Sequence, residues 1–295
     1  MPFVLKRFDV VENKDKKIQH FLTDSCGFNI STAQKLVSKG RVFDVNGKWY
    51  GMSQKVHGNF IDVAVFEGQS RGLKPLFQTN DFAFFDKPSG LMVHPSSKNT
   101  AYTLLDEIRY HFGEDANLGH RIDQETSGLV LITKNRYSDM ILKDMFENKL
   151  YQKEYLAVVK GRLDKNITID TPIKKATNSS IGVKMCCSSD GKESLTFIEP
   201  ISYDEVKNQT LVKAMPHTGR QHQIRVHLDS IGYTIVGDPI YGVDEKYADM
   251  YLNKILPQED RVKITGNKRL LLHANKMEFK YNNQLYSINS KLSLV

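Results

Sequence analysis

Near the start of the chain, apolar residues recur at helical spacing in two short segments. The apolar positions are Ile18, Phe21 and Leu22 in the first segment and Ala33, Leu36 and Val37 in the second. This spacing predicts two short amphipathic helices. Ser31 and Gln34 form a capping-box pattern at the start of the second helix, and Gly40 is a typical helix stop.

A hairpin and a further strand are predicted after these helices. Residues 41–45 and 48–50 flank Asn46-Gly47, a pair that supplies the positive φ angles of a two-residue turn. The alternating apolar positions of the further strand are Ile61, Val63 and Val65. The first part of the chain therefore combines two helices with a small sheet.

A polar segment at residues 67–75 contains glycines and ends in a proline, which favours a linker. We therefore place a domain boundary there, with a first domain over residues 1–70, a linker over 71–79 and a second domain over 80–295. Two domains fit a chain of 295 residues, since a single core rarely grows beyond about 250 residues.

The second domain interleaves strand and helix patterns. Short apolar runs typical of buried strands occur at residues 82–85 and 129–132, and residues 153–159 predict a further strand. Helical stripes are formed by Leu104, Leu105, Ile108 and Phe112, and by residues 139–146.

A run of polar and charged residues, 120–125, directly precedes the apolar run 129–132. A carboxylate on a loop tied to a core strand has a fixed position, which a catalytic group needs. Asp123 is therefore a candidate catalytic residue, although a loop Asp by itself is more typical of a turn or a cap.

Charge and cysteine usage narrow the class of protein. The net charge of +7 and the pI near 9.1 favour a polyanionic partner. The three cysteines, Cys26, Cys186 and Cys187, cannot form a disulfide framework, which favours a reducing compartment. No stretch approaches the roughly 18 apolar residues that span a bilayer, and no signal-peptide pattern opens the sequence. We expect a cytoplasmic protein without a membrane partner.

The segment His120–Gly128 reads His-Arg-Ile-Asp-Gln-Glu-Thr-Ser-Gly. It resembles the signature H-R-L-D-x-x-T-S-G of the RluA-type RNA pseudouridine synthases, with Ile122 as the only departure. Three further segments resemble the family in the right order, namely Lys87–His94, Lys153–Gly161 and Thr218–Leu228. The resemblance spans the chain from about residue 80 to the end.

This resemblance implies an α+β fold. A small N-terminal α/β RNA-binding domain would precede a pseudouridine synthase catalytic domain, which has a central mixed, mainly antiparallel sheet flanked by helices. The implied reaction converts uridine in RNA to pseudouridine. The target base would have to leave the base stack, at a cost of a few kcal/mol.

The resemblance also implies roles for individual residues. Asp123 would be the catalytic nucleophile, with Arg225 paired to it, because a nearby cation stabilises an ionised carboxylate. Tyr155 would stack on the target uracil and be placed to take the proton from ring carbon 5. The expected substrate-binding residues are His120, Arg121 and Ile224. From spacing alone, Tyr155 is more typical of a packed core aromatic and Arg225 of a surface residue.

The helices and hairpin of the first domain resemble the alpha-L RNA-binding domain of ribosomal proteins. Its basic face makes Lys35, Lys39 and Arg41 the candidates for phosphate contacts, whereas spacing alone fits ordinary solvated residues better. Family members with such a domain commonly modify large-subunit ribosomal RNA. We therefore expect that RNA as the partner of a monomeric enzyme, with transfer RNA as the alternative.

No cofactor is expected, because isomerisation needs no external group and the sequence lacks a nucleotide-binding glycine loop. No metal is expected either, since His217, His222 and His227 are five residues apart and helical ligand pairs want three or four. Two alternatives stay open. One is a catalytically silent RNA-binding or ribosome-assembly protein on the same fold. The other is a hydrolase using Ser127, although the first glycine of a nucleophile elbow is missing. The charged insert at residues 245–268 has no readable role.

Overall fold

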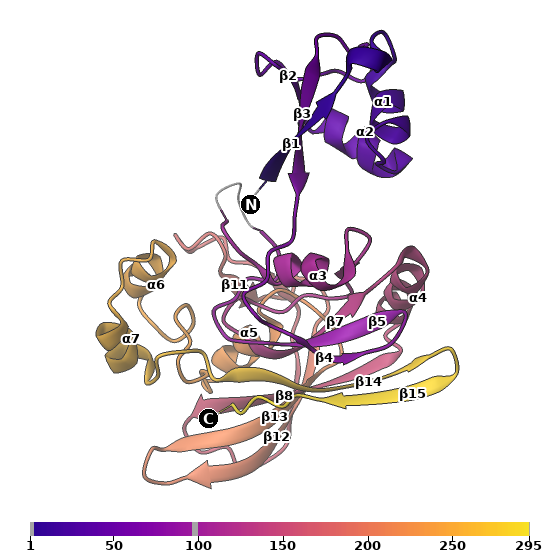
Figure 1. Ribbon diagram of the computed structural model, residues 1–295. Coiled ribbons are helices and arrows are strands. Elements are labelled where there is room, and N and C mark those ends of the chain that lie inside the picture. The colour runs from indigo at the N-terminus through magenta and orange to yellow at the C-terminus, as the bar shows by residue number, and fades with distance from the viewer. Residues whose placement is uncertain (1–2, 96–99, 295) are drawn as a thin grey trace. The chain divides into compact units, whose positions relative to one another are not determined.

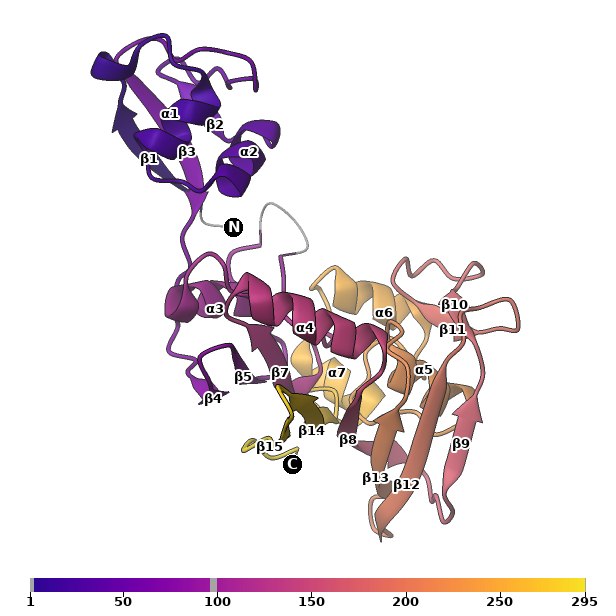
Figure 2. The ribbon, with the colours of Figure 1, turned by 90° about the vertical axis from the view of Figure 1, so that its right-hand side faces the viewer.

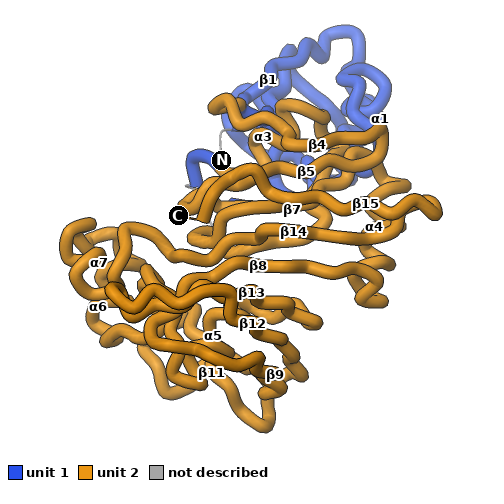
Figure 3. Tube along the Cα trace, turned by 90° about the horizontal axis from the view of Figure 1, so that it is seen from below, with its two compact units in different colours: residues 1–69, 95–102 blue, residues 70–94, 103–295 orange. Residues whose placement is uncertain are grey.

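The computed structural model of the chain describes residues 3–95 and 100–294. The chain folds into two compact units, residues 1–69 with 95–102 and residues 70–94 with 103–295, which Figure 3 colours separately. Each unit has a hydrophobic core of its own. Within the described ranges, no helix is both long and apolar enough to cross a membrane.

Unit 1 combines two short helices with an antiparallel sheet in the order β1-β3-β2 (Figure 1). Its elements are β1 (Phe3–Asp9), a 3-10 turn (Val11–Asn13), α1 (Ile18–Asp24), α2 (Ile30–Ser38), β2 (Val42–Asp44) and β3 (Phe60–Phe66). Both predicted amphipathic helices are confirmed, and all six of their apolar positions lie in the core of the unit.

Unit 1 differs from the sequence prediction at three points. The helix cap of α2 is Asn29, whose side chain accepts a hydrogen bond from the amide of Thr32 at 2.8 Å, so Ser31 is not the cap. The second hairpin strand is reduced to one bridge between Phe43 and Trp49. Strand β1 was not predicted, because its side chains are mostly exposed and leave no alternating apolar pattern.

Unit 2 is built on a sheet that has ten strands over the described residues, in the order β4-β5-β7-β14-β8-β13-β12-β9, with β15 beside β14 and β6 beside β7. These strands are β4 (Pro75–Gln78), β5 (Phe82–Lys87), β6 (Asn117–Leu118), β7 (Ser127–Thr133), β8 (Tyr151–Lys160), β9 (Ile167–Asp170), β12 (Leu195–Asp204), β13 (Gln209–Pro216), β14 (Leu272–Tyr281) and β15 (Gln284–Asn289). Only the pairing of β7 with β14 is parallel. The mixed, mainly antiparallel sheet of an α+β fold is therefore confirmed.

Helices cover this sheet, as Figure 2 shows for α3 and α4 beside β5 and β7. The helices are α3 (Leu104–Phe112), α4 (Arg136–Glu147), α5 (Gln223–Ser230), α6 (Glu245–Leu252) and α7 (Gln258–Thr265), and a separate pair of strands is β10 (Ile173–Lys175) and β11 (Met185–Cys187). Alternate residues of β7 belong to two different cores. Leu129 and Leu131 share one with α4, and Val130 and Ile132 share the other with α3. Burial on both faces explains the unbroken apolar run of β7.

Strand β4 lies within residues 71–79, the expected linker. Residues 75–78 pair with β5 at the end of the large sheet. An edge strand tolerates Pro75, because one side of its backbone has no strand partner. Most of the polar segment, residues 67–74, precedes this strand.

Gly128 fixes the junction between the polar loop and β7. Its φ of +104° is in the left-handed region, and a β-carbon there would lie 2.2 Å from the carbonyl oxygen of Ala274. Strand β14 runs beside it at this point, with His273 paired to Ser127 and Ala274 paired to Gly128. Only glycine permits this approach, so the loop that carries Asp123 is joined to the sheet at one defined place.

Candidate active site

The loop that carries Asp123 is held from behind by the turn that follows β5. The Lys87 ammonium donates to the carbonyl oxygens of Pro88, Leu91 and Gln124 at 3.1, 2.8 and 3.0 Å. Burial lowers the pKa of Lys87, but only an ammonium has three protons to donate, so the geometry fits the charged form.

Two further hydrogen bonds attach the same turn to the loop. The Ser89 hydroxyl donates to the carbonyl oxygen of Glu125 at 2.6 Å, and the Gly90 amide donates to that of Gln124 at 2.9 Å. The backbone on the C-terminal side of Asp123 is therefore anchored to residues 87–94, one of the segments that resemble the family.

Arg225 on α5 contacts the Asp123 side chain directly. Its Nη1 donates to Oδ2 of Asp123 at 3.1 Å. On its other side, its Nε and Nη2 donate to the two oxygens of Asp238 at 2.7 and 2.8 Å. Arg225 is 2% exposed, as is Asp238. The guanidinium is thus fixed between two carboxylates, one buried and one facing the cavity.

The charges of this pair are stabilised together. Burial opposes ionisation of Arg225, but Asp238 and then Asp123 more than offset it, so the pKa of Arg225 is raised. Burial likewise opposes ionisation of Asp238, but the Arg225 charge and the amides of Ile240 and Tyr241 hold its pKa below the usual value. A buried ion pair with this many hydrogen bonds keeps both partners charged.

Tyr155 reaches the same cavity from β8. The residue is buried, and its backbone pairs with Ala214 and Ala274 on the two flanking strands. Burial, followed by the nearby charge of Asp123, raises the pKa of the Tyr155 phenol. The phenol is therefore protonated at neutral pH.

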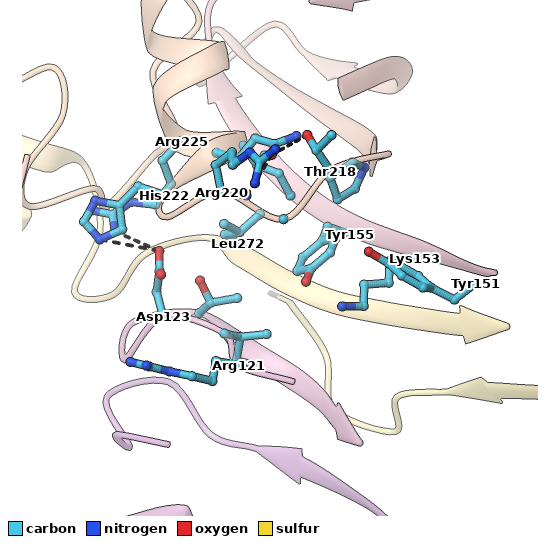
Figure 4. Close-up of a pocket in the computed structure, with 16 residues that line it drawn as sticks. Arg121, Asp123, Tyr151, Lys153, Tyr155, Thr218, Arg220, His222, Arg225 and Leu272 are labelled. Carbon is cyan, nitrogen blue, oxygen red and sulfur yellow. Dashed lines mark hydrogen bonds and ion pairs between the residues drawn. The ribbon is translucent and has the colours of Figure 1, made fainter. Parts of the chain in front are cut away.

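These groups line one cavity, shown in Figure 4. Its walls are formed by Arg121, Ile122, Asp123, Thr126, Tyr151, Lys153, Tyr155, Pro216, Thr218, Gly219, Arg220, His222, Gln223, Ile224, Arg225 and Leu272. Five of the six catalytic and substrate-binding candidates are among them. The sixth, His120, is not among them, and its Nε2 accepts a hydrogen bond from the Leu131 amide at 3.2 Å.

The three candidate phosphate contacts lie in unit 1. Lys35 and Lys39 are exposed on and just after α2. Arg41 is partly buried, with its guanidinium 4.2 Å from the centre of the Phe3 ring. The two lysines have the exposure that a phosphate contact requires.

Lys153 is a cavity residue that sequence reasoning did not single out. Its ammonium lies 4.6 Å from the centre of the Phe146 ring and 4.8 Å from that of Tyr151. Burial lowers the pKa of Lys153 to about 7. A signal was present, since Lys153 and Tyr155 are two apart on a strand and share one face. Figure 4 shows both side chains directed into the cavity.

Asp238, His222 and Tyr241 were also missed as site residues. His222 immediately precedes α5, and its Nε2 is 3.8 Å from Oδ2 of Asp123. The segment 237–242 supplies the carboxylate that holds Arg225. An Asp in a Gly-Asp-Pro sequence is typical of a turn, so no local signal marks it.

Known proteins resemble this chain in sequence and in fold. A sequence model of the family described as RNA pseudouridylate synthase matches residues 81–230. A Helicobacter pylori protein named "Uncharacterized RNA pseudouridine synthase" is 36% identical over 99% of this chain and 95% of its own length. A Nitrosomonas europaea protein named "Ribosomal large subunit pseudouridine synthase D" is 34% identical over 66% of this chain and 57% of its own length.

A solved structure titled "Human RNA Pseudouridylate Synthase Domain Containing 1" aligns with a TM-score of 0.60 at 24% identity. It covers 76% of this chain and 85% of that one, and the likeness concerns the fold. The family match contains Asp123, Tyr155 and Arg225. The family model matches residues 81–230, and the Helicobacter pylori relative matches 99% of this chain at 36% identity. The chain therefore belongs to the RNA pseudouridine synthases, a family of isomerases.

Proposed function

We propose that this enzyme converts specific uridines of large-subunit ribosomal RNA to pseudouridine, with Asp123 as the nucleophile. The observation that carries the mechanism is the contact of Asp123 with Arg225 in a cavity that Tyr155 also lines. A carboxylate, its cationic partner and an aromatic wall in one cavity fit the recognition of a single uracil turned out of the RNA.

The reaction moves the uracil on its own ribose. The bond between ribose carbon 1 and ring nitrogen 1 breaks, the ring turns, and ring carbon 5 bonds to ribose carbon 1. Carbon 5 loses a proton and nitrogen 1 gains one. Attack of Asp123 on the ribose, attack on the ring, and removal of a ribose proton all use the same carboxylate, which Arg225 holds at 3.1 Å.

Tyr155 supplies an aromatic wall for the uracil. Its phenol has a raised pKa, so the phenolate is scarce at neutral pH and the stacking role is the better supported of the two that the family resemblance implies. The phenol of Tyr151 and the amine of Lys153 lie on the same face of β8 as Tyr155, and both also line the cavity.

Base flipping is the step that gives the substrate access to Asp123. Arg121 lies two residues before Asp123, lines the cavity and is exposed. An exposed guanidinium next to the cavity can stack in the space that the flipped base leaves. This supports the proposed role of Arg121 in offsetting the cost of unstacking.

The choice of ribosomal RNA rests on two observations. Relatives from Nitrosomonas europaea and Zymomonas mobilis, 34% and 31% identical, are named for the large ribosomal subunit. Unit 1 combines two short helices, a small sheet and exposed lysines, which supports an alpha-L-type RNA-binding domain. Lys35, Lys39 and Arg41 are its proposed phosphate contacts.

The decisive experiment uses ribosomal RNA tritiated at uracil carbon 5, from cells that lack the gene. The purified enzyme should release tritium, and the modified positions should coincide with pseudouridines that the deletion removes. Asp123→Asn should reduce release by about a thousand-fold or more, because the nucleophile is gone. Full activity of Asp123→Asn would exclude the proposed nucleophile. Release from transfer RNA alone would exclude the proposed substrate.

Ser127→Ala separates this mechanism from the hydrolase alternative. The Ser127 hydroxyl is 2.9 Å from Nδ1 of His273, and the other nitrogen of that ring is 2.8 Å from the Ser290 hydroxyl, which donates to Asp86. The resulting chain resembles a hydrolase triad in composition. However, Ser127 is 3% exposed, His273 is fully buried, and neither lines the cavity.

We therefore expect Ser127→Ala to retain most of the activity and to lose stability. The opposite pattern, an active Asp123→Asn and an inactive Ser127→Ala, would support the hydrolase. A protein that binds ribosomal RNA but releases no tritium from any RNA would instead be the catalytically silent alternative.

A further inference from the structure

Arg225 and His222 both face the same oxygen of the Asp123 carboxylate. Arg225 Nη1 is 3.1 Å from Oδ2, and His222 Nε2 is 3.8 Å from Oδ2. Over the described parts of the chain, Oδ1 has neither a hydrogen bond nor an ion pair. The two carboxylate oxygens are therefore not equivalent, and Oδ1 is the one left for the substrate.

The protonation of the His222 ring can be derived from its second nitrogen. Nδ1 lies 2.9 Å from the Tyr241 hydroxyl, and that hydroxyl oxygen accepts a hydrogen bond from the Met185 amide at 3.0 Å. A phenol has one proton to donate. Donation to Nδ1 satisfies every group in this chain of contacts and leaves the ring proton on Nε2.

The other arrangement leaves a polar group unsatisfied. If Nδ1 carried the proton, the Tyr241 oxygen would accept twice, and its own proton would have no acceptor in this chain of contacts. Tyr241 is 2% exposed, so water cannot readily replace the missing partner, and an unmet buried donor is costly. The Tyr241 hydroxyl thus selects the His222 tautomer whose Nε2–H faces Asp123.

The surrounding charges keep this ring neutral. Burial and then the Arg225 charge lower the pKa of His222 to about 4, although Asp123 and Asp238 act in the opposite direction. At neutral pH the ring therefore offers one N–H to Asp123 and no positive charge. Of the two side chains that face Oδ2, Arg225 is therefore the one that carries a positive charge.

One short segment orients both partners of Asp123. Asp238 binds the Arg225 guanidinium, whose central carbon is also 5.0 Å from the centre of the Tyr241 ring. The Tyr241 hydroxyl holds His222, which has a left-handed backbone with φ of +56°. A residue other than glycine adopts that conformation at an energetic cost, so the ring position of His222 is set by its surroundings.

We propose that His222 is a positioning residue, held as the Nε2–H tautomer by Tyr241, that together with Arg225 restrains Oδ2 of Asp123 and presents Oδ1 to the uridine. The inference rests on the proposed role of Asp123. It adds the reacting oxygen and two residues, His222 and Tyr241, to that mechanism.

Nitrogen NMR of the enzyme labelled with ¹⁵N-histidine tests the tautomer without any substrate. The His222 signals, assigned with His222→Gln, should show a protonated Nε2 and an unprotonated Nδ1 at neutral pH. Tyr241→Phe should move the ring toward a mixture of tautomers. A wild-type ring that is protonated on Nδ1, or on both nitrogens, would overturn the proposal.

Single-turnover kinetics test the positioning role. Tyr241→Phe should lower the rate of the chemical step by about ten-fold with little change in RNA affinity, the size typical of a lost outer hydrogen bond at a metal or catalytic group. His222→Gln keeps an N–H donor and should retain more activity than His222→Leu. Equal activity of these two His222 variants would overturn the role.

Tyr203→Phe is a control variant. The Tyr203 hydroxyl donates to Asn208, away from the cavity. The variant should change neither the spectrum of His222 nor the rate. If Tyr241→Phe does not fold, the wild-type spectrum and the two His222 variants decide the question. An active Asp123→Asn would remove the proposed function while leaving the tautomer result intact. If Asp123→Asn is inactive but the wild-type His222 ring is protonated on Nδ1, the proposed function stands and only this inference about His222 is wrong.

Discussion

Arg225 and Asp238 form a buried ion pair in which two guanidinium nitrogens donate to the two carboxylate oxygens at 2.7 and 2.8 Å. The pair fixes the guanidinium whose remaining nitrogen reaches Asp123. Asp238 therefore acts on the Asp123 side chain without touching it, because a freely rotating arginine would not hold the carboxylate in one place.

Asp238→Asn should destabilise the protein by about 3–5 kcal/mol, because it breaks a buried charge pair and leaves the guanidinium undercompensated. Urea unfolding measures this change. Asp204→Asn is a matched control, since Asp204 is exposed and pairs with Lys207 at 3.4 Å, and an exposed pair contributes at most about 1 kcal/mol. Equal effects of the two variants would contradict the role assigned to Asp238.

Lys153 should make the free energy of unfolding increase as the pH rises above about 7. Its pKa is about 7 in the folded protein because of burial, against roughly 10.4 in an unfolded chain. Between these values the unfolded chain holds a proton that the folded protein lacks, so the free energy of unfolding rises with pH. Below about pH 7 the folded and unfolded proteins both hold the proton, and burial of the charged ammonium lowers the free energy of unfolding by its full amount.

The measurement compares wild type with Lys153→Met by urea unfolding between pH 7 and pH 9. The difference in unfolding free energy should move in favour of wild type as the pH rises, by at most about 1.4 kcal/mol per pH unit, the slope of one proton. The exposed Lys207→Met should show no such trend. A flat difference for Lys153→Met would mean that the lysine keeps an ordinary pKa.

The insert at residues 245–268 should support the Asp123 loop. Glu125, two residues after Asp123, accepts hydrogen bonds from the Tyr251 hydroxyl at 2.7 Å and from Arg261 Nη2 at 2.5 Å. Arg261→Met should therefore lower the rate of isomerisation by about ten- to a hundred-fold, because small displacements of a catalytic group are costly. Tritium release at saturating RNA measures the effect.

The control for this variant is Lys263→Met on the same helix. Lys263 is exposed and its ammonium is 3.8 Å from Asp260. Its loss should leave the rate within about two-fold, since surface ion pairs contribute little. An Arg261→Met enzyme with normal activity would show that α7 is dispensable for the position of Asp123.

The lysines of unit 1 should determine how RNA binding responds to salt. Each cation that contacts phosphate steepens the fall of log K with log salt by roughly 0.7 to 0.9. Lys35→Gln and Lys39→Gln should each make the slope shallower by about that amount, whereas Lys207→Gln in unit 2 should not. Binding isotherms at several salt concentrations measure the slopes, and unchanged slopes would exclude the phosphate contacts.

Local patterns in the sequence were sufficient for much of this protein. The spacing of apolar residues reflects backbone geometry over a few positions. It was enough to predict the two amphipathic helices of unit 1, the buried strands at residues 82–85 and 129–132, and the polar loop before residue 129. The signature at residues 120–128 then pointed to Asp123, and family resemblance pointed to Tyr155 and Arg225.

Tertiary structure alone decided which groups surround that carboxylate. Arg225 binds Asp238, which is 13 positions away, and Glu125 binds Arg261, which is 136 positions away. His222 contacts the hydroxyl of Tyr241. A turn aspartate, an insert arginine and a buried tyrosine have no periodic signal of their own. Their roles exist only once packing has brought distant segments together and removed the water that would otherwise satisfy and screen them.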